Sequence, residues 1–221
     1  TSLGLKSKIM TFSRASKEDI DRAVECGVWG AVVEIPSGVP RLKYQYTKWS
    51  KEEIIERSIT AIKYAKDKGL FVNFFPFDTT RAELDFLKRL VSEVAAKAKP
   101  DSVCVVDTTG CILPRAMAFV VRELKREVDI PIEVHTHNDL GCGIATSLAA
   151  VEAGAETVHV CANGLGERTG NASLEEVSVA LKTMLGVETS IKYEKLFELS
   201  QLVENLSGMR LGAQKPLMGR I

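Results

Sequence analysis

The sequence has no surplus of charge of either sign. Its 221 residues include 29 Lys and Arg against 29 Asp and Glu, and its pI is near 6.8. It also has no apolar run that approaches the ~20 residues of a membrane span, and its first residues lack the charged-then-apolar order of a signal peptide. Nucleic acids and anionic membrane surfaces attract proteins with a basic excess. We therefore expect no nucleic-acid partner, no membrane partner and a cytoplasmic location.

The sequence also lacks an ordered cysteine pattern. Its five cysteines are scattered and contain no CxxC pair, which argues against a disulfide framework and against a thiolate zinc site. Internal repeats, low-complexity tracts and flexible linkers are absent as well, so two separate domains have little support.

What the sequence does contain is an alternation of short β-branched runs with longer helical patterns. This alternation is typical of βαβ units around a parallel sheet, so the predicted class is α/β. Six such units suggest a (β/α)8 barrel or a doubly wound sheet, and a complete barrel needs two more strands. The expected strands are residues 8–12, 31–35, 70–75, 102–106, 132–135 and 157–161, and helices are expected at about 16–27, 50–69, 82–98, 114–127 and 193–206.

The densest polar cluster, His-Thr-His-Asn-Asp at 135–139, ends the fifth predicted strand. Residues two apart on a strand share a face, so His135 and His137 should project side by side while Thr136 points the other way. Two neutral imidazoles can occupy adjacent positions around Zn or another first-row divalent ion. Paired histidines can instead hydrogen-bond neighbouring carboxylates, but active sites of parallel α/β folds lie at this end of the strands. We expect a metal here, with a hydrogen-bond partner for each ring.

Two other strand ends carry polar motifs. Asp107-Thr108-Thr109-Gly110 follows the fourth strand, and a glycine-rich loop, 163–171, follows the sixth. For the first motif an ordinary strand-to-helix turn capped by Asp or Thr is the favoured interpretation. The second motif lacks the GxxxxGK[ST] pattern of a phosphate loop.

Taken together, these strand ends resemble one family. DTTG, HTHNDLGCGIATSLAAVEAGA and NGLGERTGNASLEEV, with SRASKEDIDRAVECGV near the start and KPLMGR at the end, are similar to the acyl-CoA-using DRE-TIM metallolyases. Among these, the isopropylmalate, citramalate and homocitrate synthases of amino-acid biosynthesis match best. The resemblance implies a (β/α)8 barrel, a divalent metal (Zn, Mn or Mg), acetyl-CoA and a 2-oxo acid as substrates, and a homodimer. It also implies that His135, His137 and Asn171 hold the metal and that Thr108 holds the carboxylate of the 2-oxo acid.

The resemblance also indicates what the chain lacks. The Arg-Asp-Gly segment of the family's first strand, which supplies a metal-binding aspartate and a catalytic arginine, does not occur in the sequence. We therefore expect residues 1–221 to form a partial barrel domain that corresponds to family strands three to eight. The final helical segment, about 190–221, should begin the region that follows the barrel.

A second departure lies at the third predicted strand, residues 71–81. When Asp78 and Arg81 are aligned with the synthases' Glu-Asp-x-x-Arg, Phe77 stands where those enzymes have an acid–base glutamate. Asn73 and Phe75 then replace residues that help to hold the substrate, Asn73 in place of an arginine. A 2-oxoglutarate-like substrate is disfavoured, because no bidentate partner for its distal carboxylate is offered. Asn73, Phe75 and Phe77 should share one face of the strand.

Another residue must then move protons, or the reaction differs. Glu34 and His159 are the candidates, although a salt-bridged Glu34 and a packed His159 are the ordinary alternatives. We predict an acyltransferase that joins acetyl-CoA to a 2-oxo acid by metal-dependent Claisen condensation. A carbon–carbon lyase or aldolase of the same superfamily, similar to 3-hydroxy-3-methylglutaryl-CoA lyase, is the main alternative. A non-catalytic ligand-binding descendant is the third.

Overall fold

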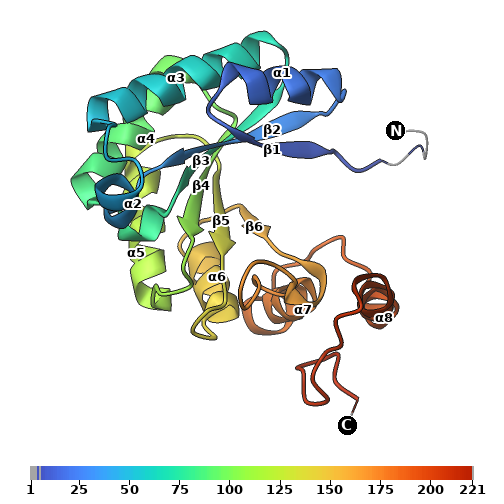
Figure 1. The fold of residues 1–221 in the computed structure, drawn as a ribbon. Coiled ribbons are helices and arrows are strands. Elements are labelled where there is room, and N and C mark those ends of the chain that lie inside the picture. The colour runs from blue at the N-terminus through green and yellow to red at the C-terminus, as the bar shows by residue number, and fades with distance from the viewer. Residues whose placement is uncertain (1–3, 5, 221) are drawn as a thin grey trace. The chain divides into compact units, whose positions relative to one another are not determined.

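The computed structural model describes residues 4 and 6–220, and six strands of this part of the chain form one sheet. Each strand pairs with the next one along the chain, in the order β1-β2-β3-β4-β5-β6 (Figure 1). A doubly wound sheet requires a reversal of strand order, and this order has none. The predicted α/β fold of six consecutive units of a (β/α)8 barrel is therefore confirmed. The strands are β1 (Met10–Arg14), β2 (Gly30–Pro36), β3 (Phe71–Phe77), β4 (Ser102–Asp107), β5 (Ile132–Thr136) and β6 (Thr157–His159).

The described strands and helices lie close to the predicted ranges, and three differences stand out: two concern strands and one concerns a helix. The first strand lies two residues later than expected, and β6 ends at His159, after which Cys161 makes an isolated bridge with Ser173. The expected loop after β2 contains a short helix, because a proline is tolerated in a first helical turn. The helices are α1 (Lys17–Glu25), α2 (Val39–Tyr44), α3 (Lys51–Asp67), α4 (Leu84–Ala98), α5 (Pro114–Glu127), α6 (Gly143–Glu152), α7 (Leu174–Leu185) and α8 (Leu196–Ser207), with short 3-10 turns η1 (Thr79–Arg81), η2 (Ala162–Gly164) and η3 (Tyr193–Lys195).

The chain divides into two compact units. Unit 1 comprises Thr1–Val106 and Val120–Glu133, and unit 2 comprises Asp107–Phe119 and Val134–Ile221. The single catalytic domain expected from the sequence stays a prediction. In the described part of the chain, no helix combines the length and the apolar character that a membrane crossing needs.

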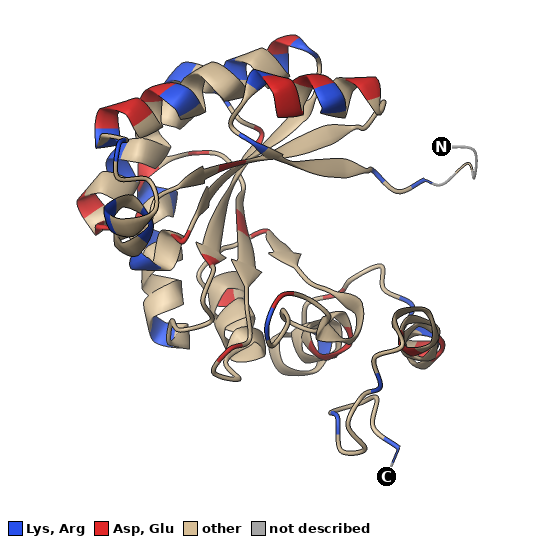
Figure 2. Cartoon of the chain, in the orientation of Figure 1, with Lys and Arg blue, Asp and Glu red and all other residues tan. Residues whose placement is uncertain are grey.

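Two helices of unit 1, α1 and α3, begin at the caps and end near the glycines that the sequence indicated. The Ser16 and Ser50 hydroxyls accept hydrogen bonds from the backbone N–H groups of Asp19 and Glu53, which caps α1 and α3. Beyond the other end of α3, Gly69 has a φ of +80°, a conformation that glycine adopts without strain. Figure 2 shows that Lys, Arg, Asp and Glu gather on the helices of this unit, while its strands are mostly tan.

The strands of unit 1 have two apolar faces. One face packs beneath the helices, and its members Val33, Val72 and Phe74 are fully buried or nearly so. On the other face Phe75 clusters with Cys104 and Val106, and Val32 and Phe77 pack against this cluster. The expected alternation along β3 is therefore confirmed, since Phe75 and Phe77 belong to one face.

Candidate metal and active site

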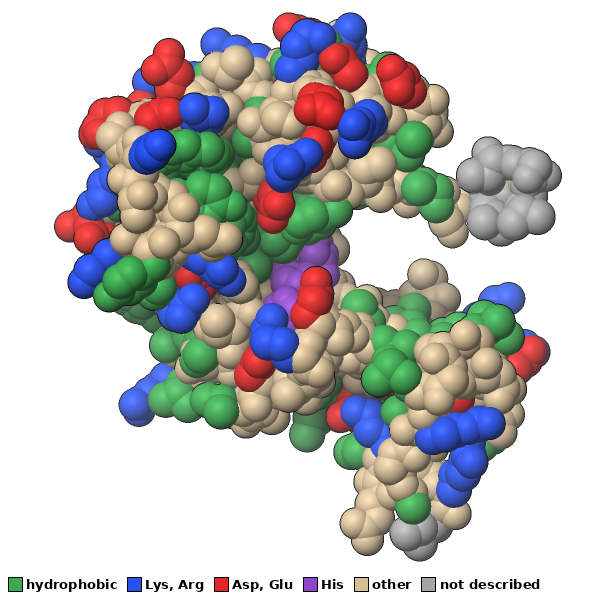
Figure 3. All heavy atoms as spheres, viewed as in Figure 1, with side chains coloured by type: hydrophobic (Ala, Val, Ile, Leu, Met, Phe, Trp, Pro, Cys, Tyr) green, Lys and Arg blue, Asp and Glu red, His purple; other side chains and the backbone are tan. Residues whose placement is uncertain are grey.

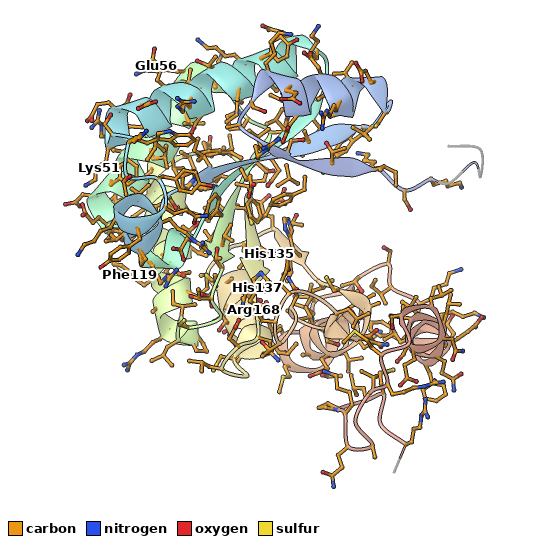
Figure 4. The ribbon with its side chains drawn as sticks, in the orientation of Figure 1. Lys51, Glu56, Phe119, His135, His137 and Arg168 are labelled. Carbon is orange, nitrogen blue, oxygen red and sulfur yellow. The ribbon has the colours of Figure 1, made fainter. Side chains whose placement is uncertain are left out.

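His135 of β5 and His137, which directly follows the strand, lie on the face opposite its helix-facing side chains. Val134 and Thr136 are fully buried, and the Thr136 hydroxyl lies 2.8 Å from the Ser147 hydroxyl of α6. Alternation along the strand then directs His135 and His137 to the other face, as predicted. Figure 4 shows both rings, with Arg168, at the end of β5.

The rings of this histidine cluster approach one another closely. The Nε2 atoms of His135 and His137 are 3.3 Å apart. The ring of His159, from β6, has its centroid 5.6 Å from that of His135. Histidine side chains reach the molecular surface as a single purple patch (Figure 3). His159, which is 22 residues beyond His137 in sequence, thus joins the other two histidines of the chain within unit 2.

Asn171 joins the cluster from the glycine-rich loop. It makes an isolated antiparallel bridge with His137, and its N–H donates to the carbonyl of Gly164. Its amide nitrogen lies 3.1 Å from His135 Nε2, while its Oδ1 is buried without a hydrogen-bond partner in the described part of the chain. A Cβ on Gly166 would lie 1.6 Å from this oxygen. The Asn171 amide therefore fits here because residue 166 has no side chain.

The electrostatic surroundings keep both imidazoles of β5 neutral at physiological pH. Burial, followed by the repulsion of His159 and His137, lowers the pKa of His135 to about 3. Burial is also the main reason why the pKa of His137 is lowered, and the nearby positive charge of Arg168 adds to it. Neutral imidazole is the form that binds a metal ion.

These residues fit a divalent metal ion in part. Two ligands at a tetrahedral angle, each about 2.05 Å from the metal, stand about 3.3 Å apart, which is the separation of the two Nε2 atoms. The buried Asn171 oxygen is an acceptor that a cation would satisfy. In residues 4 and 6–220, however, no group of three or more His, Cys, Asp and Glu side chains is placed to hold a metal. These described residues offer two imidazoles and one amide oxygen as ligands.

One expectation about this cluster was wrong. His137 Nδ1 is buried and has no hydrogen-bond partner among the described residues, whereas we expected a partner for each ring. The backbone positions this residue instead: its N–H donates to the carbonyl of Asp107, and its bridge with Asn171 holds the other side. The residue is therefore placed by main-chain pairing.

The Asp-Thr-Thr-Gly motif forms a capped turn, as favoured. The buried Asp107 carboxylate accepts hydrogen bonds from the N–H groups of Cys111 and Ile112, both at 3.3 Å. Gly110 has a φ of +59°, and a Cβ there would lie 2.5 Å from the Asp139 backbone nitrogen. The motif therefore packs tightly against the HTHND segment. The contact of Thr108 with a substrate carboxylate stays a prediction.

An ion pair that no motif in the sequence predicted joins the loops of this site. Arg168 donates to both oxygens of Asp139, at 2.7 and 2.9 Å, and to the carbonyl of Thr108 at 2.7 Å. Arg168 is a non-glycine residue with a φ of +59°, so its backbone is strained. The opposite charges in HTHND and GERTGN were the only signal in the sequence, and charge alone does not show which loops meet.

In unit 1, Glu34 lies near the carboxyl end of β2 and lines a pocket of about 400 Å³, as Phe77 does. Burial raises the pKa of the Glu34 carboxyl group, although the positive charge of Arg14 opposes this shift. A carboxyl group whose pKa is raised in this way suits proton transfer near neutral pH. The catalytic roles of Glu34 and His159 stay predictions.

The other residues singled out on β3 differ in their surroundings. Asn73 is buried, and its amide nitrogen donates to the Ser102 hydroxyl at 2.9 Å. Phe75 is 3% exposed and makes an edge contact with the ring of Phe12. Phe77 is half-buried beside Tyr46 and beneath the Arg41 guanidinium. Contact between these three side chains and a substrate stays a prediction.

Curated relatives are similar to this chain over almost its whole length. It is 46% identical over 218 residues to a 2-isopropylmalate synthase of Methanocaldococcus jannaschii, covering 99% of this chain and 42% of that protein. It is 41% identical to homocitrate synthase AksA of Methanopyrus kandleri, covering 98% and 54%, and 40% identical to (R)-citramalate synthase CimA of M. jannaschii, covering 99% and 44%. The chain therefore spans about half the length of these relatives.

Solved structures share the fold at low sequence identity. A Bacillus subtilis HMG-CoA lyase superposes with a TM-score of 0.80 at 20% identity, covering 94% of this chain and 72% of that one. An Acinetobacter baumannii HMG-CoA lyase, solved with coenzyme A and 3-methylmalate, superposes with a TM-score of 0.80 at 21% identity, covering 96% and 73%. These likenesses support the barrel fold.

A family model described as HMGL-like matches residues 2–203, which include every strand and the whole histidine cluster. The match and the synthase relatives confirm the resemblance to the DRE-TIM metallolyases, a family that uses a divalent metal. The chain belongs to the HMGL-like family.

Proposed function

We propose that the protein containing this chain is an acyltransferase that condenses acetyl-CoA with a 2-oxo acid. The observation that carries the proposal is the convergence of two neutral imidazoles and the buried, unpaired Asn171 oxygen at the carboxyl end of β5. The names of the curated relatives, which are 2-isopropylmalate, citramalate and homocitrate synthases, support this reaction class.

In the proposed site His135, His137 and Asn171 hold a divalent cation. Such a cation, when bound, stabilises the negative charge that develops on the keto oxygen of the acceptor. Thr108 binds the acceptor carboxylate through its hydroxyl group. The Arg168 pair with Asp139 keeps the loop of Asn171 next to the loop of Thr108.

A base must remove a proton from the methyl group of the thioester. The methyl carbon then forms a bond with the keto carbon, and hydrolysis of the thioester by water releases coenzyme A and a 2-hydroxy diacid. We assign the base to Glu34, with His159 as the alternative. Glu34 is the stronger candidate because burial raises its pKa at the wall of an open pocket.

A carbon–carbon lyase of the same superfamily is the second candidate. It is favoured by Phe77, which takes the place of the synthase glutamate in the resemblance and lies under a guanidinium group among aromatic rings. Phenylalanine cannot transfer a proton, so a condensation that depended on that glutamate would be impaired. Release of acetyl-CoA from an added 3-hydroxyacyl-CoA thioester, or of pyruvate from an added hydroxy acid, would identify the lyase.

The test is an assay of full-length protein with acetyl-CoA and a panel of 2-oxo acids. Free thiol and the hydroxy-diacid product are measured with and without chelator, and after metal is restored. We expect thiol release that requires both an acceptor and metal. Equal release without an acceptor would show simple thioester hydrolysis, and turnover of hydroxy acids alone would favour the lyase. A homodimer and a cytoplasmic location are further predictions for the full-length protein.

A further inference from the structure

The pocket that contains Glu34 has a wall of aromatic rings. Its lining includes Tyr46 and Trp49, which follow α2, and Phe77 at the carboxyl end of β3. The Tyr46 ring lies 4.9 Å from the Trp49 ring and 6.2 Å from the Phe77 ring, measured between centroids. These distances are those of direct aromatic contact, so the three rings form one continuous apolar surface.

The two arginines that line this pocket are already paired with acids. Arg14 donates its Nε and one terminal nitrogen to the two oxygens of Asp19, at 2.8 and 2.7 Å. Arg57 donates to Glu53 through its Nε and a terminal nitrogen, and its guanidinium lies over the Trp49 ring, 4.4 Å from the ring centroid. A second carboxylate on a ligand would therefore compete with Asp19 or Glu53 for a guanidinium group that already has a partner.

The lining also contains two acids, Glu18 and Glu34, and Glu34 in particular disfavours a negatively charged ligand. It is half-buried near the carboxyl end of β2, where the addition of a second negative charge would be repulsive. An uncharged apolar group, by contrast, would exchange water for contact with three rings. The pocket volume of about 400 Å³ is within the range of small-molecule sites.

We propose that this pocket binds the side chain of the acceptor, and that the preferred acceptors are 2-oxo acids whose side chain is uncharged, apolar and about the size of a ring. The proposal rests on the function proposed above, because it takes the acceptor to be a 2-oxo acid. Phe77 is the main specificity-determining residue, and Tyr46 and Trp49 complete the surface. Acceptors with a second carboxylate, such as 2-oxoglutarate, are rejected.

The first experiment measures binding, without turnover, through the fluorescence of Trp49. Full-length protein is titrated with cyclohexylpyruvate, pyruvate and 2-oxoglutarate. We expect saturable quenching by cyclohexylpyruvate at a concentration about tenfold or more below that needed for pyruvate. The signal should persist in Trp29→Phe and vanish in Trp49→Phe. Quenching that persists in Trp49→Phe, or an equal response to 2-oxoglutarate, would overturn the proposal.

The second experiment measures selectivity, with a matched control on the same strand. Phe77→Ala should lower the ratio of kcat/KM for cyclohexylpyruvate over pyruvate by about tenfold or more. Phe71→Ala removes an equally half-buried ring from the other end of β3, where it stacks on Trp29, and should leave the ratio within about twofold. An equal change in both variants would overturn the assignment of Phe77.

The two experiments separate this proposal from the function on which it rests. Selective quenching of Trp49 by cyclohexylpyruvate in a protein that condenses no 2-oxo acid would refute the proposed reaction. The proposed apolar binding pocket would then still stand. Condensation with a preference for pyruvate or 2-oxoglutarate would retain the synthase and refute the pocket. If Phe77→Ala does not fold, the Trp49 titration of the unaltered protein alone decides.

Discussion

Unit 2 and unit 1 present different chemistry at the carboxyl ends of their strands. Unit 2 gathers three histidines, an asparagine and an Arg–Asp pair: contacts link His135 to His137, Asn171 and the ring of His159, and Arg168 bridges Asp139 and Thr108. Unit 1 gathers aromatic rings, two arginines paired with acids and one half-buried glutamate. The first set resembles the family's metal ligands, while the second departs from the family at Phe77, Phe75 and Asn73.

The difference shows which parts of such a site tolerate change. His137 and Asn171 are fixed by backbone pairing, and Gly110 and Gly166 leave room for close approaches, so few substitutions would fit. The wall of the unit 1 pocket is made by side chains from the regular elements β1, β2, β3, α1 and α3 and from the segment after α2, where residues can change without moving the backbone. Reactivity and specificity can therefore diverge in unit 1 while the ligand cluster is retained.

Removal of the proposed base should have the largest effect. Glu34→Gln keeps the shape of the side chain and should lower the rate of condensation by about 10² to 10⁴, the usual contribution of a general base. Initial rates of thiol release measure this, with His159→Asn as the comparison variant. A wild-type rate in Glu34→Gln with a loss in His159→Asn would move the base to unit 2. The double variant Glu34→Gln/Phe77→Glu tests whether a glutamate at the family's position for the base restores the rate of condensation.

The buried His135 should make the stability of the metal-free protein depend on pH. Its pKa is about 3 in the folded protein and about 6.5 in the unfolded chain, so the unfolded chain binds more protons between these values. The stabilisation is fully present above pH 6.5 and is lost as the pH falls. The free energy of unfolding should therefore decrease by about 3 kcal/mol between pH 7 and pH 4. Urea denaturation at several pH values measures the loss, and His135→Gln should reduce it. The same pH dependence in His135→Gln would contradict the assignment.

Loss of one imidazole should weaken metal binding strongly. His137→Ala should lower the affinity for Zn or Mn by about 10²-fold, because a direct ligand contributes at least as much as the outer residues that support it. Calorimetric titration measures the affinity. His159→Asn, in the same cluster, should stay within about threefold. Equal losses in both variants would indicate that His159 is a ligand.

Displacement of the Asn171 amide should have a smaller effect. In Gly166→Ala the new Cβ would collide with Asn171 Oδ1, the end of a side chain that can rotate away. We expect a tenfold loss of metal affinity, on the order of the effect of a supporting residue, with little change in melting temperature. Gly212→Ala, which places its Cβ in open space within the same unit, is the control. An unchanged affinity in Gly166→Ala would remove Asn171 from the ligand set.

Much of the fold could be predicted because its signals are local. Ser16 and Ser50 cap the helices that follow them, and glycines end those helices, as their sequence positions indicated. The helix α2 was missed because Pro40 in its first turn has the same local signature as a loop. The Arg168 pair with Asp139 was missed because it spans 29 residues and depends on where two loops meet.

The sequence by itself determined the βα alternation, the helix boundaries and the shared face of His135 and His137, because each follows from a period of two or from a cap within a few residues. Tertiary structure decided that Asn171 reaches His135 across 36 residues, that His137 Nδ1 has no hydrogen-bond partner among the described residues, and that the Tyr46 ring meets the Phe77 ring. These contacts depend on how loops return to the ends of strands, and no periodicity in the sequence encodes a distance between residues so far apart.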